Sequence, residues 1–216
     1  MPVSPQAALP SRSRRIARVA AGLAAGLLLA CAGSLVVRAP QEPQPHPASV
    51  LGQIAPLAIA VPPAGGAAAA ADPLGERAGG WGRRGGSIAM TERPGDLVRR
   101  VVIQELEQAG HRIVAENADV NVGIEVREFS VDAPRSGRGW DVAVAMRVAL
   151  RVSRRPGADD WSEFVYGAES VAHTPAPPGV SMVERILAQA VRQLGLLLAE
   201  RQALAAALER IGGAAG

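Results

Sequence analysis

The sequence contains no lysine, a single cysteine, and few aromatic residues: three tryptophans, two phenylalanines and one tyrosine among 216 residues. One cysteine cannot form a disulfide within the chain, so folding depends on the hydrophobic core alone. With so few aromatic side chains, that core must consist mainly of Val, Leu, Ile and Ala. The apolar fraction of 48% and the charged fraction of 20% are typical of folded proteins and exclude wholesale disorder.

Charge is unevenly distributed at the N-terminus. Four arginines (Arg12, Arg14, Arg15 and Arg18) precede residues 19–37, which contain no charged side chain. A basic segment followed by an apolar one is typical of an export signal. Removing residues 1–30 changes the formal net charge from +3 to 3 − 4 = −1. The basic balance therefore belongs to the signal, and it is no evidence for a nucleic-acid partner.

The apolar segment ends in Leu28, Leu29, Ala30 and Cys31, a sequence that resembles the bacterial lipobox. The resemblance implies that residues 1–30 are a signal peptide, that the Cys31 sulfur receives a diacylglyceryl group, and that the chain is cleaved before Cys31. Acyl chains would then hold the protein in a membrane, since each buried methylene contributes about 0.8 kcal/mol. Ala32 follows the cysteine where these signals carry Asp for inner-membrane retention, so the resemblance implies the periplasmic side of the outer membrane.

Two other interpretations of the N-terminus remain open. Residues 19–37 are long enough to span a bilayer as an uncleaved anchor, which would place a single N-terminal anchor in the inner membrane. Ser13, Arg14 and Arg15 also resemble part of a twin-arginine signal.

Composition divides the exported part of the chain. Residues 31–56 are rich in proline and predict an extended tether. Residues 57–212 predict a single domain, within which residues 62–86, rich in Gly and Ala, predict a mobile loop.

Periodicity predicts an α+β fold. Apolar residues alternate over 120–126, 140–152 and 161–172, which indicates three long strands in an antiparallel meander, with shorter strands before them. Two amphipathic helices are expected, from Pro94 to Gly110 and over residues 181–211, both packed on one face of the sheet. Ser181 and Glu184 are expected to form a capping box. Residues 199–211 could serve as core or as a contact for an envelope protein, and oligomeric state is left open.

The order of these features resembles the YajG-type lipoproteins and the related auxiliary lipoproteins of ABC-type transport systems. The resemblance rests on residues 28–31, 81–90, 105–110 and 120–129. It implies a bacterial envelope lipoprotein that acts as an accessory or docking subunit of an envelope or transport complex. The alternative is a periplasmic module that binds a lipid or a glycan.

The sequence offers little catalytic chemistry. Residues 80–85 fit G-x-G-x-x-G, but an Ala/Gly-rich segment precedes them and a short strand follows, unlike a nucleotide site. We expect a surface loop there, with Trp81, Arg83 and Arg84 as candidate contacts to anionic lipid or peptidoglycan. The three histidines are far apart in sequence and lack ligand spacing. We therefore expect no enzyme activity, no cofactor and no metal site.

Overall fold

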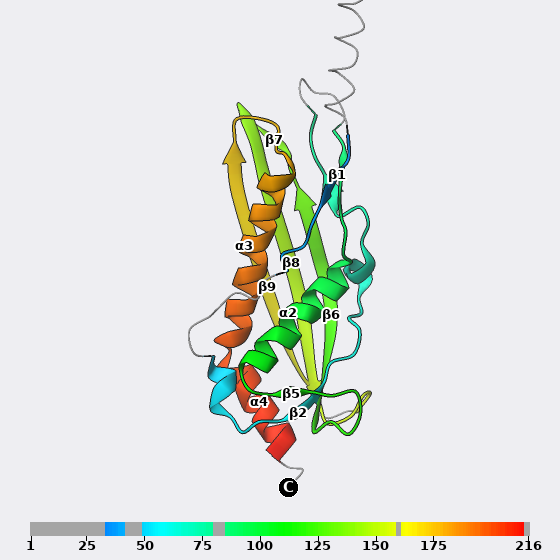
Figure 1. Cartoon of the computed structure of the whole chain (residues 1–216), viewed down its shortest axis with the longest axis vertical. Helices are drawn as coiled ribbons and strands as arrows, with labels where there is room; N and C mark the ends of the chain where they lie inside the picture. Colours follow the sequence, from blue (N-terminus) through cyan, green and yellow to red (C-terminus); the bar gives the residue numbers. More distant parts are fainter. Residues whose placement is uncertain (1–32, 42–48, 80–84, 159–160, 214–216) are drawn as a thin grey trace, which may run out of the picture.

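The computed structural model describes residues 33–41, 49–79, 85–158 and 161–213, which form a mixed α+β fold as predicted (Figure 1). Its elements in chain order are β1 (Leu35–Val37), η1 (Val50–Gln53), β2 (Ala58–Ala60), η2 (Ala67–Ala70), β3 (Gly75–Glu76), β4 (Ser87–Met90), α2 (Pro94–Gln108), β5 (Arg112–Ile113), β6 (Val120–Asp132), β7 (Arg135–Ser136), β8 (Gly139–Ser153), β9 (Ser162–Thr174), α3 (Val180–Ala199) and α4 (Gln202–Gly213).

The three long strands form the predicted antiparallel meander, with β8 between β6 and β9. On β8 the even-numbered side chains from Val142 to Val152 are buried, as their alternation indicated. A β-bulge interrupts β6 between Val126 and Glu128. The extra residue changes the inward positions from even to odd, so Phe129 and Val131 are buried.

The short strands are arranged in two groups. β2 lies parallel to both β5 and β6 and extends the large sheet beyond the meander. β1, β4 and β3 form a separate three-stranded sheet, in which β1 and β4 are parallel. The N-terminal strands therefore contribute parallel pairs, whereas the meander is wholly antiparallel.

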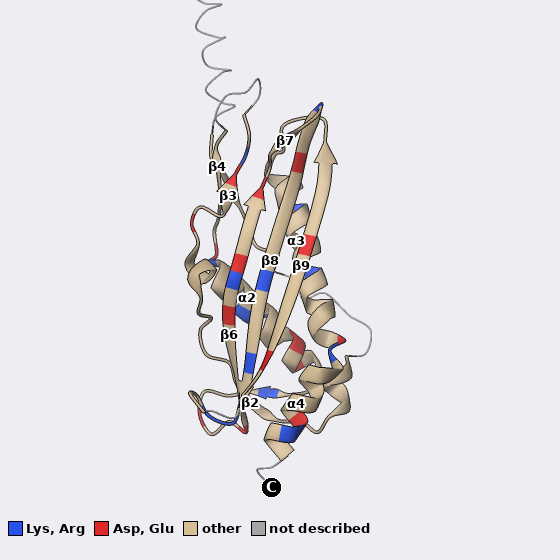
Figure 2. Ribbon diagram, turned by 180° about the vertical axis from the view of Figure 1, so that it is seen from behind, with Lys and Arg blue, Asp and Glu red and all other residues tan. Residues whose placement is uncertain are grey.

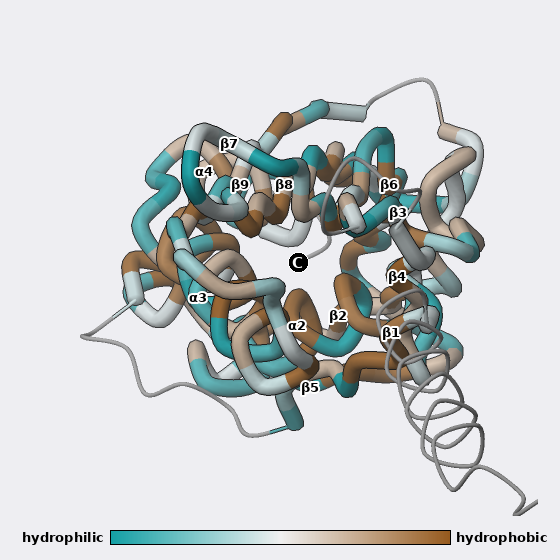
Figure 3. Tube along the Cα trace, turned by 90° about the horizontal axis from the view of Figure 1, so that it is seen from above, coloured by the Kyte–Doolittle hydropathy of each residue, from teal (hydrophilic) through white to brown (hydrophobic). Residues whose placement is uncertain are grey.

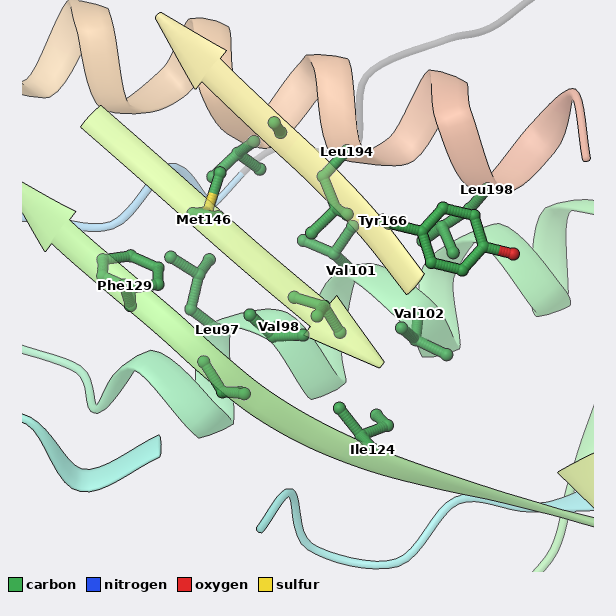
Figure 4. Packing of buried hydrophobic residues seen from close by; sticks show 14 of the residues in the cluster. Leu97, Val98, Val101, Val102, Ile124, Phe129, Met146, Tyr166, Leu194 and Leu198 are labelled. Atoms are coloured by element: carbon green, nitrogen blue, oxygen red, sulfur yellow. The ribbon is translucent and has the colours of Figure 1, made fainter. Parts of the chain in front are cut away.

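The helices lie on one face of the large sheet, giving two layers (Figures 1 and 3). The first helix follows the prediction closely, with Pro94 in its first turn and Gly110 at a φ of +90° just beyond its end. Figure 4 shows Leu97 and Val101 from α2 and Leu194 from α3 pointing toward Met146 on β8. All four side chains are buried, so one apolar layer joins both helices to the sheet.

Part of the predicted tether is folded, which corrects the boundary at residue 57. Residues 35–37 form β1, in which Val37 is fully buried, and Leu51 in η1 is 1% exposed. The Arg100 guanidinium on α2 also donates a hydrogen bond of 2.8 Å to the Pro40 carbonyl oxygen. Proline content indicated an extended chain, which is correct locally, but long-range contacts hold residues 33–41 and 49–56 against the domain.

The predicted mobile loop over residues 62–86 also needs correction. Its described parts contain η2 and β3, and Leu74 is buried. A Cβ atom at Gly86 would overlap the Gly33 carbonyl oxygen, so glycine is required there by close packing. Residues 80–84, with Trp81, Arg83 and Arg84, lie outside the described residues.

The predicted helix over residues 181–211 is two helices, with a break at Glu200 and Arg201. The Ser49 hydroxyl donates to the Ala199 carbonyl oxygen at 3.1 Å, which provides a partner for one carbonyl group at the end of α3. The change of direction lets the apolar side of α4 remain on the core. The break occurs where Arg201 interrupts the apolar stripe of the sequence.

The expected capping box is absent. Gly179 occupies the N-cap position of α3, and glycine has no side chain with which to cap the helix. The Glu184 carboxylate instead accepts a hydrogen bond of 2.9 Å from the backbone N–H of Arg38. A long-range contact with the N-terminal segment has replaced the local one.

Candidate functional site

The point where the described chain begins is held by a buried arginine. Arg77, between β3 and β4, is 9% exposed. Its Nη2 donates to the Gly33 carbonyl oxygen at 3.0 Å, and its Nη1 donates to the Pro178 carbonyl oxygen at 3.4 Å. Because Pro178 lies just before α3, one guanidinium connects the start of the described chain to the start of that helix. We call Gly33, Arg77 and Pro178 the entry clamp.

The entry clamp is joined to the base of the β7–β8 hairpin. The backbone N–H of Ala78 donates to the Ala133 carbonyl oxygen at 2.9 Å. The Trp140 indole N–H donates to the Ala78 carbonyl oxygen at 3.0 Å, and the Arg135 guanidinium lies 5.6 Å from the centre of the Trp140 ring. The hairpin residues 134–138 are exposed. The start of β1 and this hairpin therefore lie at the same end of the molecule, opposite α4 (Figure 1).

Acidic and basic residues alternate along the middle of the long strands (Figure 2), and on the face opposite the helices four of them form a closed ring of ion pairs. Glu163 on β9 contacts Arg127 on β6 at 2.7 Å and Arg151 on β8 at 3.0 Å, and Glu125 contacts the same two arginines at 3.5 and 3.3 Å. Hydrogen bonds from Arg151 and then Arg127 lower the pKa of Glu163, and Glu163 raises the pKa of Arg127. The ring joins all three strands and carries no net charge, so it does not form a basic or acidic binding surface.

The outer strand β9 and the residue before it carry three of the most exposed large apolar side chains of the described structure. Among the described strands, β9 pairs with β8 alone, and its other edge has no strand partner. Val165 and Val171 on this strand are 43% and 65% exposed, and Trp161 just before it is 49% exposed. An unpaired strand edge with exposed apolar side chains is a common docking surface for another chain. We call these three residues together with the free edge of β9 the β9 edge.

A shallow hollow of about 580 Å³ lies between the start of β9 and α4. Phe164, Ala203 and Ala206 line its apolar part, and the Arg210 guanidinium at its rim donates to the Ser162 hydroxyl at 2.7 Å. Within the described ranges, no three His, Cys, Asp or Glu side chains gather closely enough to hold a metal ion. None of the helices in the described part of the chain has both the length and the apolarity needed to cross a bilayer.

The residues singled out in the sequence fall into two groups. Cys31 and the lipobox residues Leu28, Leu29 and Ala30 lie outside the described residues, as do Trp81, Arg83 and Arg84. The apolar residues of 199–211 are described, and Leu204, Leu208 and Ile211 are buried in the core. The sequence did not reveal Arg77, because one arginine in a Gly/Ala-rich segment has no periodic signature of burial.

His111 is buried where η1, β2 and α2 meet, and its surroundings disfavour the charged form of the ring. It is 4% exposed, and its Nδ1 accepts a hydrogen bond of 3.3 Å from the Leu57 N–H. Burial lowers the pKa of His111, and the nearby backbone of Leu51 opposes this effect in part. The folded state therefore favours the neutral ring, and its stabilising effect is present above the pKa of the unfolded chain and is lost as the pH falls through the folded value.

We expect the melting temperature to fall between about pH 7 and pH 5, and to fall less in His111→Asn, which keeps an acceptor but cannot be protonated. Thermal unfolding monitored by circular dichroism across this range tests the expectation. His173→Asn is the matched control, because His173 is exposed and bonded at 2.8 Å to Asp141. An unchanged pH profile in His111→Asn would contradict the assignment.

Comparisons with known proteins give the fold its context. No family model matches the chain, and a search of curated proteins finds no match. The structure is similar to protein XCC0632 from Xanthomonas campestris, of family DUF330, with a TM-score of 0.56 and 14% identity, over 81% of this chain and 98% of that one. At this identity the similarity shows a shared fold.

A bacterial lipoprotein and a dodecameric protein are also among the similar solved structures. Lipoprotein GNA1162 from Neisseria meningitidis matches with a TM-score of 0.32 and 12% identity, over 65% of this chain and 99% of that one. A PelC dodecamer from Paraburkholderia phytofirmans matches with a TM-score of 0.32 and 18% identity, over 69% of this chain and 94% of that one. None of these three is named as a YajG-type protein, so that resemblance stays a prediction, whereas the chain does share its fold with the DUF330 protein.

Proposed function

We propose that this protein is a non-enzymatic lipoprotein of the bacterial envelope, anchored through Cys31 in the outer membrane, and that it serves as an accessory subunit of an envelope complex. The observation that carries the proposal is the position of the entry clamp. Gly33 is bonded to Arg77 only two residues after the predicted acylated cysteine. The predicted cleavage point thus lies close in sequence to a residue that is bonded to the domain.

This position gives the anchor a mechanical consequence. Two residues span at most about 7 Å, so an acylated Cys31 would hold the domain directly at the membrane surface. A long flexible tether would let the domain sample many orientations, whereas the entry clamp restricts it to few. A fixed orientation suits a subunit that presents one surface to a partner.

The β9 edge is the surface that we propose for docking an envelope protein. It combines a strand edge that no other described strand covers with the exposed side chains of Trp161, Val165 and Val171. A partner that adds a strand there would continue the large sheet, and its own side chains on the open face would pack beside those of β9. The ring of ion pairs on the same sheet joins β9 to β8 and β6. Because the ring has no net charge, it does not attract partners of either charge.

The anchor is tested by growing cells with a clickable fatty acid and comparing the wild type with Cys31→Ala. We expect label on the wild type and none on the variant. The variant protein should also be absent from the washed membranes or remain uncleaved. Equal labelling of both proteins would show that Cys31 is not the lipid attachment site.

Docking is tested in the same cells with a photo-crosslinking residue at Val165 or Val171. The same residue at Arg192, which is exposed on α3, is the control. A specific adduct is expected from β9 alone, and equal adducts from all three positions would refute the docking surface.

A further inference from the structure

The geometry points to a second membrane contact: we propose that the exposed β7–β8 hairpin, through Arg135 and Arg138, rests on the anionic headgroups of the bilayer that holds the anchor. This inference rests on the proposed anchoring at Cys31. It adds a lipid-binding surface and fixes which end of the domain faces the membrane.

The first step is the position of the hairpin relative to the anchor. Ala133 accepts a hydrogen bond from the N–H of Ala78, and Arg77 beside it bonds to Gly33. Two short links thus connect the base of the hairpin to Gly33, the described residue that lies nearest to Cys31 in the sequence. Figure 1 shows β7 and the start of β1 at the same end of the long axis. A bilayer that holds Cys31 within about 7 Å of Gly33 must therefore also lie close to the hairpin.

The second step is the chemistry of the hairpin. Residues 134–138 are all exposed, and they include Arg135 and Arg138 but no acidic residue. Figure 2 shows a basic segment of the ribbon at the tip of β8, beyond the acidic segments of the long strands. Among the acidic residues on the adjoining strands, Glu76 is exposed, Asp132 accepts the Glu76 N–H at 3.0 Å, and Asp141 is bonded to His173.

The third step is the rigidity of the support. Trp140, at the base of the hairpin, is 6% exposed and bonded through its indole N–H to Ala78. Arg135 lies over the Trp140 ring, so its guanidinium is partly ordered before any lipid is bound. A pre-ordered guanidinium loses less conformational freedom on contacting a phosphate than a free one. Each arginine near an anionic surface should shift the balance toward contact roughly fivefold.

The molecule supplies its own control at the opposite end. The turn between β8 and β9 also carries two exposed arginines, Arg154 and Arg155. β8 has 15 residues, and a strand of that length separates its two ends by about 46 Å. The two pairs of arginines are alike in number and exposure, but only the β7–β8 pair lies beside the chain entry.

The experiment uses the full chain purified from membranes and reconstituted into vesicles of phosphatidylcholine with or without roughly 30% phosphatidylglycerol, a fraction chosen to give a strongly anionic surface. Acylation would consume the only native cysteine, so Ser136→Cys or Glu209→Cys would provide one free thiol for a fluorophore. A spin-labelled lipid then quenches any probe at the bilayer surface. We expect strong quenching at position 136 in anionic vesicles, weaker quenching in neutral ones, and little at position 209.

The double variant R135Q/R138Q should lose most of the quenching gained from anionic lipid, whereas R154Q/R155Q should keep it. Equal quenching in both double variants, or stronger quenching at position 209 than at 136, would overturn the proposal. The intact mass of the purified protein distinguishes failure of the hairpin contact from failure of the anchor. If Cys31 carries its lipid and position 136 is not quenched, the hairpin contact is wrong and the anchor stands. If the mass shows an unprocessed chain, the proposed anchoring fails and the hairpin contact falls with it.

Discussion

Ending the chain after Glu200, which removes α4, is expected to unfold the domain under conditions in which the full-length protein is folded. Leu204, Leu208 and Ile211 are 2%, 0% and 7% exposed in the complete structure. Burying each of these side chains contributes about 1.5–3 kcal/mol, and their loss would also expose the residues that they cover. That total approaches the whole stability of an ordinary domain, about 5–15 kcal/mol.

A single substitution gives a graded form of the same prediction. Leu208→Ala should lower the free energy of unfolding by about 2–5 kcal/mol, as measured by urea denaturation. Glu209→Ala, on the exposed side of α4, should change it by less than about 0.5 kcal/mol. If the shortened protein melted like the full-length one, α4 would be a peripheral helix available to a partner, and the assignment of its apolar side to the core would be wrong.

The break before α4 shows where sequence periodicity stops being sufficient. Apolar residues continue at helical spacing from Leu187 to Ile211, and residues 199–202 include no Pro or Gly that would stop a helix. The break depends on tertiary contacts, among them the bond from Ser49 to the carbonyl of Ala199 and the Arg201 guanidinium 5.8 Å from the centre of the Tyr166 ring. Partners that are distant in sequence leave no trace in a local pattern.

The meander illustrates the opposite case. The large apolar residues from Val142 to Val152 occupy every second position because helices cover one face of β8, whereas the other face carries exposed Arg147 and Arg151 among alanines. Burial on one face imposes a period of two residues, so strand, face and core could all be predicted. In β6 the same reasoning holds as far as Val126 and then fails, because the bulge shifts the period by one residue.

The candidate site was predicted less completely than the fold. The cysteine and its preceding residues have a chemical signature, so the anchor could be proposed from sequence. The free edge of β9 could not, because pairing across a sheet becomes visible only when the strand order is known. The entry clamp could not be predicted either, because Arg77 is 44 residues from Gly33 and 101 residues from Pro178 in the sequence.

Replacing Arg77 with alanine is the second substitution for which we expect a large effect. The guanidinium is buried and donates hydrogen bonds to the carbonyl oxygens of Gly33 and Pro178. A hydrogen bond to a charged group contributes about 1.5–3 kcal/mol, and a buried carbonyl left without a partner adds to the cost. We therefore expect Arg77→Ala to lower the free energy of unfolding by about 3 kcal/mol or more. Replacing Arg192, an exposed residue on α3, with alanine should change it little.

Arg77→Lys distinguishes the role of charge from that of geometry. A lysine keeps the positive charge but lacks the planar fork that reaches two carbonyl groups at once, so we expect it to recover only part of the lost stability. A spin label at Ser34 provides a readout that stability alone would not move. If Arg77 fixes the chain entry, the label should become more mobile in Arg77→Ala at temperatures where the domain remains folded, and stay ordered in Arg192→Ala. A label that is equally ordered in both variants would mean that other contacts of β1, such as the bond from Arg38 to Glu184, orient the domain on its anchor.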